Sequence, residues 1–198
     1  MPPDDPIAEA LREIRISLGE VEAEPSESAK KTEVQIRKRP LTLEEGQLIV
    51  DQAATWENTP YNEVGGASKK GLDGQADCSG STFHIYKDAG FPYSSTSIGT
   101  KDFRAYLEDP KRNRFTKIAD ISQAQPGDLL FWPGRHMGIF AAFLDDDDTR
   151  KGWKSGKKYT HNMWTARDYG KPYCSHLWET IRGGAVPEVY RYMIEEVQ

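Results

Sequence analysis

Apolar residues recur at helical spacing near the N-terminus. Between residues 6 and 18 they stand four, three and four positions apart, at Ile7, Leu11, Ile14 and Leu18. This spacing places them on one face and predicts a short amphipathic helix. Residues 19–40 are rich in Glu, Lys and Ser, which predicts a solvated linker. We expect residues 1–40 to be a helix with a flexible tether, and the helix face is also suited to docking on a partner.

Further helices are predicted at the start of a compact domain that we place at residues 41–198. Thr42 and Glu45 form a capping-box pair ahead of apolar positions that continue to Trp56. A glycine-rich loop over residues 59–75 then leads to a helix over residues 79–89, which is stopped by glycine and proline. A short helix is also expected around residues 101–107.

The second half of the chain reads as strands. Apolar or alternating runs occupy four segments, Asp128–Trp132, Met137–Leu144, Lys158–Trp164 and Val186–Ile194. The acidic tetrad Asp145–Asp148 between the second and third runs predicts a turn. Helices followed by strands with short links favour the α+β class, with an antiparallel sheet covered on one side by helices.

The amino-acid composition excludes some classes of function but does not identify one. Aromatic residues make up 11% of the 198 residues, which indicates a folded core. The net charge is −5 and no basic cluster is interleaved with aromatics, so we expect no nucleic-acid partner. Neither a secretory signal nor an apolar run long enough for a membrane span is visible, which predicts synthesis as a soluble cytoplasmic protein.

Cys78 is the candidate nucleophile because it begins a predicted helix. Backbone N–H groups and the positive end of the helix dipole stabilise a thiolate there. Ser79 and Gly80 are small enough for close approach of a substrate, and the N–H of Cys78 is placed to hold an oxyanion. A cysteine in this position is, taken alone, more typical of a small buried hydrophobe.

His136 is the candidate general base. It follows a turn and leads a nearly continuous apolar run, so it lies at the end of a buried strand, within reach of a helix packed on that strand. A third polar residue on the next strand would fix the imidazole tautomer. His161 and Asn162 both suit this role, and strand alternation lets only one of them face the site.

These segments together resemble the NlpC/P60 family of cell-wall peptidases. The resemblance covers residues 45–165 and rests on the order of six motifs: Tyr61, Gly65-Gly66, Asp77-Cys78-Ser79-Gly80, Gln125-Pro126-Gly127-Asp128-Leu129, His136-Met137-Gly138-Ile139-Phe140 and Thr160-His161-Asn162. An extra residue after Tyr61, Phe140 in place of tyrosine and Ser81 in place of an aliphatic depart from the family pattern.

The resemblance implies a papain-like fold and hydrolysis of amide bonds in peptidoglycan stem peptides through a thioacyl-enzyme. Cys78 attacks, His136 transfers the proton and His161 orients His136, while Tyr61, Asp77 and Ser79 are the candidate substrate and oxyanion residues. An acyltransferase on the same scaffold and a catalytically silent wall-binding module are the alternatives.

No metal or other cofactor is expected. Cys174 and His176 stand two positions apart, but a metal site needs three or four ligands, and His84 lies far away in a predicted helix. The two cysteines, Cys78 and Cys174, are expected to be free thiols.

A wall peptidase made without a signal must reach its substrate by another route. We therefore expect action in the periplasm or at the cell wall after non-classical export, as in a secreted antibacterial effector or a phage-type lytic protein. An effector would imply a cognate immunity protein as a partner.

Overall fold

The computed structural model describes residues 36–63, 67–143, 162–167 and 171–197. The predicted helix over residues 6–18, the acidic turn Asp145–Asp148 and His161 lie outside the described residues. The linker was predicted to extend to Pro40, but its last five residues, Ile36–Pro40, form a strand instead.

Three α-helices and two short 3₁₀ segments occur in the described ranges. The α-helices are α2 (Leu43–Ala54), α3 (Cys78–Asp88) and α4 (Phe103–Glu108), and the 3₁₀ segments are η1 (Ile121–Gln123) and η2 (Trp178–Gly184). The capping box predicted for the first of them is confirmed, since Glu45 N–H donates to Thr42 and Thr42 N–H donates to the Glu45 carboxylate. All three predicted helices of the compact domain are therefore present.

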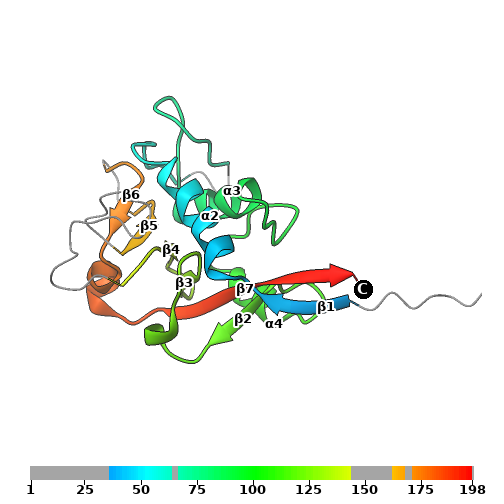
Figure 1. Ribbon diagram of the computed structural model, residues 1–198. Helices are drawn as coiled ribbons and strands as arrows, with labels where there is room; N and C mark the ends of the chain where they lie inside the picture. Colours follow the sequence, from blue (N-terminus) through cyan, green and yellow to red (C-terminus); the bar gives the residue numbers. More distant parts are fainter. Residues whose placement is uncertain (1–35, 64–66, 144–161, 168–170, 198) are drawn as a thin grey trace, which may run out of the picture. The chain divides into compact units, whose positions relative to one another are not determined.

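The strands form one sheet in which every strand pair is antiparallel. They are β1 (Ile36–Pro40), β2 (Phe115–Ile118), β3 (Leu129–Trp132), β4 (His136–Phe140), β5 (Met163–Thr165), β6 (Cys174–His176) and β7 (Glu188–Val197). The order is β1-β7-β3-β4-β5-β6, with β2 also paired to β7 (Figure 1). Helices α2 and α3 contact β4 and β5. An antiparallel sheet with separate helices is the predicted α+β class.

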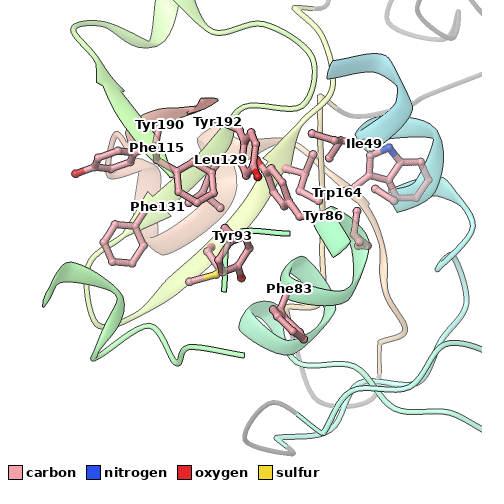
Figure 2. Packing of buried hydrophobic residues seen from close by; sticks show 14 of the residues in the cluster. Ile49, Phe83, Tyr86, Tyr93, Phe115, Leu129, Phe131, Trp164, Tyr190 and Tyr192 are labelled. Atoms are coloured by element: carbon pink, nitrogen blue, oxygen red, sulfur yellow. The ribbon is translucent and has the colours of Figure 1, made fainter. Parts of the chain in front are cut away.

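Side chains of the sheet alternate between two hydrophobic clusters. Along β3, Leu129 and Phe131 belong to the larger cluster, while Leu130 and Trp132 belong to the smaller one. This is the period of two that a strand buried on both faces requires. The larger cluster is rich in aromatic side chains, many from α3, β3 and β7; Figure 2 shows Phe83, Tyr86, Tyr93, Phe115, Phe131, Tyr190 and Tyr192 among them.

The turn before β3 is held by two tight contacts. Gly46 of α2 lies so close to this turn that an added Cβ would stand 1.9 Å from the Pro126 carbonyl oxygen. The buried carboxylate of Asp128 accepts two hydrogen bonds from Arg191 of β7, at 3.0 and 2.8 Å. Together these contacts fix the start of β3, and the β3–β4 hairpin then carries His136 opposite Trp132.

Candidate active site

Helix α3 begins at Cys78, as the sequence predicts, and Asp77 caps it. One carboxylate oxygen of Asp77 accepts hydrogen bonds from the Gly80 N–H at 2.7 Å and from the Ser79 hydroxyl at 2.8 Å. Both Asp77 and Ser79 are largely buried. The first turn is therefore rigid, and it holds the Cys78 side chain at the helix N-terminus.

The Cys78 thiol is less acidic than its position predicts. Burial raises its pKa to about 11, and the negative charge of Asp77 acts in the same direction. Backbone N–H groups of Met137, Ser79 and Cys78 itself lower the pKa only in part. The N–H groups at the helix start favour the thiolate, as expected, but desolvation outweighs them in the unliganded protein. At neutral pH the sulfur carries its proton.

His136 is the first residue of β4 and is almost fully buried. Its ring lies 5.7 Å from that of Trp132, centroid to centroid. Burial, together with electrostatic interactions with Arg182, His176 and Arg167, lowers the pKa of His136 to about 3. The imidazole is therefore neutral at neutral pH, which is the form that can accept a proton.

Thr165, the last residue of β5, contacts the His136 ring. Its Oγ1 lies 3.1 Å from His136 Nε2 and donates to the Met137 carbonyl oxygen at 2.8 Å. Thr165 is buried, and the pairing of Ile139 with Trp164 sets it on the strand next to β4. Sequence reasoning missed this residue because the predicted strand, 158–164, ended one position before Thr165.

Asn162 and His161 are the two residues that the sequence offers for orienting the imidazole, and the structure describes only the first. Asn162 is described, and its amide donates to the Glu179 carboxylate at 3.2 and 3.3 Å while its carbonyl oxygen accepts from the Trp178 N–H at 3.0 Å. This amide is therefore engaged with η2 and makes no hydrogen bond to His136. His161 lies outside the described residues, so its predicted role stays a prediction.

Cys78 and His136 line the same cleft, which has a volume of about 380 Å³. Tyr61, Asp77 and Ser79 also contribute to its wall, so the structure brings together the described sequence candidates except Asn162. Tyr61 is placed there by a β-bridge to Ala76. In the described part of the chain no hydrogen bond joins the thiol to the imidazole, a contact that often tightens only when substrate binds.

A second cavity of about 240 Å³ shares part of its wall with this cleft. His136, Arg167 and Arg182 line both cavities, and Thr180, Ile181 and Gly183 complete the wall of the smaller one. Arg182 has a left-handed backbone with φ of 51°, and its guanidinium donates to the Arg135 carbonyl oxygen at 3.2 Å. Sequence reasoning identified neither Arg167 nor Arg182, because neither residue belongs to the motifs.

Within the described ranges, no group of three or more His, Cys, Asp and Glu side chains is arranged to hold a metal ion. Cys174 Sγ lies 3.4 Å from His176 Nε2, and both cysteines are free thiols. Among the helices of the described residues, none is long and apolar enough to cross a bilayer.

Comparison with known proteins agrees with this geometry. The structure combines an antiparallel sheet with a cysteine at the start of a helix and a histidine at the start of a strand. These features define a class of α+β thiol proteins. The NlpC/P60 family model matches residues 58–174, more than half of the chain and the part that contains Cys78, His136 and Thr165. The chain belongs to the NlpC/P60 family. Searches of curated proteins and of solved structures found no match.

Proposed function

We propose that this protein is a cysteine peptidase that hydrolyses amide bonds in the stem peptides of peptidoglycan. The observation that carries the proposal is the shared cleft of Cys78 and His136 inside the region that matches a family of cell-wall peptidases. A thiol and a neutral imidazole facing one cleft are the groups that acyl transfer needs.

The reaction follows from the protonation states of the two groups. His136 takes the thiol proton as the Cys78 sulfur attacks the carbonyl carbon, since neither group is charged beforehand. The N–H of Cys78 stabilises the oxyanion of the tetrahedral intermediate. The imidazolium then returns the proton to the leaving amine, which leaves a thioester. Water activated by His136 hydrolyses the thioester and restores the thiol.

The arginines around His136 support a substrate that carries carboxylates. Arg167 and Arg182 line both cavities, and Arg135 lines the larger one, where Glu63, Asp77 and Asp102 also contribute to the wall. A guanidinium binds a carboxylate with two parallel hydrogen bonds. Peptides of the cell wall carry free carboxylates near their amide bonds, so they fit this lining better than uncharged amides do.

The proposed substrate places the site of action at the cell wall or in the periplasm. Delivery as an antibacterial effector, with an immunity protein that blocks the cleft, is part of this proposal. Expression with and without an added export signal tests it: lysis confined to the exported form supports wall action, whereas equal toxicity of the form retained in the cytoplasm contradicts it.

Digestion of purified muropeptides tests the enzymatic activity. The wild-type protein should release new amine and carboxylate ends, measured by mass spectrometry of the fragments. Cys78→Ala should abolish release while thermal unfolding shows the fold retained, and Cys174→Ser should cleave like the wild type. Absence of cleavage by the folded wild-type protein would contradict the proposal.

A further inference from the structure

The hydroxyl of Thr165 has one proton and two close polar neighbours. The Met137 carbonyl oxygen lies at 2.8 Å and can only accept, whereas His136 Nε2 lies at 3.1 Å and can accept or donate. Another carbonyl, that of Ala166, lies farther away at 3.4 Å. The hydroxyl proton therefore goes to the Met137 carbonyl, and the lone pairs of Oγ1 face the imidazole.

This arrangement determines which ring nitrogen of His136 carries the proton. A hydroxyl that already donates to a carbonyl can only accept from Nε2, so Nε2 must be the protonated nitrogen. Nδ1 then keeps its lone pair and is the nitrogen able to take a proton from the thiol. Thr165 is 1% exposed and His136 is 4% exposed, so water does not replace this contact.

We propose that Thr165 is the positioning residue of the site: by accepting from His136 Nε2 it holds the imidazole in the tautomer whose Nδ1 serves as the general base. The proposal rests on the proposed function for its role in turnover. It gives to a threonine the role that the family resemblance assigned to His161.

A threonine differs from a histidine or a carboxylate in this place. It accepts one hydrogen bond but brings no charge to stabilise the imidazolium, and the nearby Arg182 and Arg167 are cationic. The imidazolium therefore exists only while the intermediate is charged. Thr165 selects the tautomer, and it does so before substrate arrives.

Nitrogen NMR of the histidine rings tests the tautomer without any substrate. The His136 signals are assigned by their loss in His136→Gln, since the chain has 4 histidines. We expect Nε2 to be protonated and Nδ1 unprotonated in the wild type and in Thr165→Ser. In Thr165→Val, which keeps the shape but removes the acceptor, Nδ1–H should become populated. A protonated Nδ1 in the wild type would overturn the proposal, even if the valine variant fails to fold.

Turnover of muropeptides by the same variants separates Thr165 from His161. We expect kcat to fall roughly a hundredfold in Thr165→Val, the lower end of the contribution of general acid–base catalysis, with KM unchanged. Thr165→Ser should restore most of the activity. Loss in His161→Ala with full activity in Thr165→Val would refute the assignment. An inactive wild type with the expected NMR signals would count against the proposed function alone.

Discussion

At the scale of single residues, burial decides the chemistry of the site. The sequence correctly marks Cys78 as the first residue of a helix, but a linear pattern does not show how deeply the sulfur is covered. Desolvation raises the pKa of Cys78 to about 11 and lowers that of His136 to about 3. The resting site is consequently an uncharged thiol and an uncharged imidazole.

The uncharged pair makes Cys78 a slow nucleophile toward small reagents. In the Cys174→Ser protein, alkylation by iodoacetamide at pH 7 should be roughly a hundredfold slower than that of a free cysteine, because only the thiolate reacts and its pKa is raised from 9.0 to about 11. The rate, followed by intact-protein mass, should rise as the pH approaches 11. Fast alkylation that is independent of pH between 5 and 8 would indicate a thiolate–imidazolium pair and contradict this picture.

At the scale of elements, sequence patterns predict helices and strands correctly where local signals are strong. The capping pair Thr42 and Glu45 and the apolar runs after Asp128 and His136 each predicted an element that the structure contains. Short strands at the sheet margins escaped prediction: β1, β2 and β6 have three to five residues and a mixed polar pattern. The pairing of β1 and β2 with β7 is long-range, so nothing in their own residues reveals it.

The pairing of β5 with β4 determines which residue contacts His136. Sequence reasoning placed the third residue at His161 or Asn162, whereas the pairing of Phe140 with Met163 brings Thr165 toward the imidazole. Register within a sheet is a tertiary property, and the aromatic and polar residues between 158 and 165 are compatible with more than one register.

Close packing of α2 on the turn before β3 gives a prediction about stability. Gly46→Ala adds a Cβ that would lie 1.9 Å from the Pro126 carbonyl oxygen, so backbone must move. We expect a loss of about 1–3 kcal/mol in the free energy of unfolding, measured by urea denaturation, despite the better helix propensity of alanine. Gly99→Ala, where an added Cβ meets nothing within 4 Å, is the matched control. Equal stability of the two variants would show that α2 does not pack this closely.

At the scale of the whole domain, the site is assembled from segments that no local pattern connects. Cys78 comes from α3, His136 from β4, and Arg182 from η2 near the C-terminal strand. The motifs of the sequence identified the first two. The arginines were not identified because their importance comes from lying beside His136 in space, which only the fold reveals.

Arg182 should determine selectivity for substrates with a carboxylate. Replacing it with glutamine removes a charged hydrogen-bond donor, so KM for a muropeptide should rise about tenfold, as expected for the loss of roughly 1.4 kcal/mol of charged hydrogen bonding. KM for the same peptide with its carboxylates converted to carboxamides should not change. Arg112→Gln, on the wall of a different cavity, is the control. An equal rise in KM for both peptides would contradict a carboxylate-binding role.

The central claim is that Cys78 forms a covalent bond to the substrate, and acid quenching during turnover tests it most directly. Intact-protein mass spectrometry of the quenched wild type should show the added mass of the acyl group. Proteolytic mapping should place that mass on the peptide that contains Cys78 and not on the one that contains Cys174. Muropeptide cleavage by Cys78→Ala at the wild-type rate, with no acyl adduct on the wild type, would contradict the account.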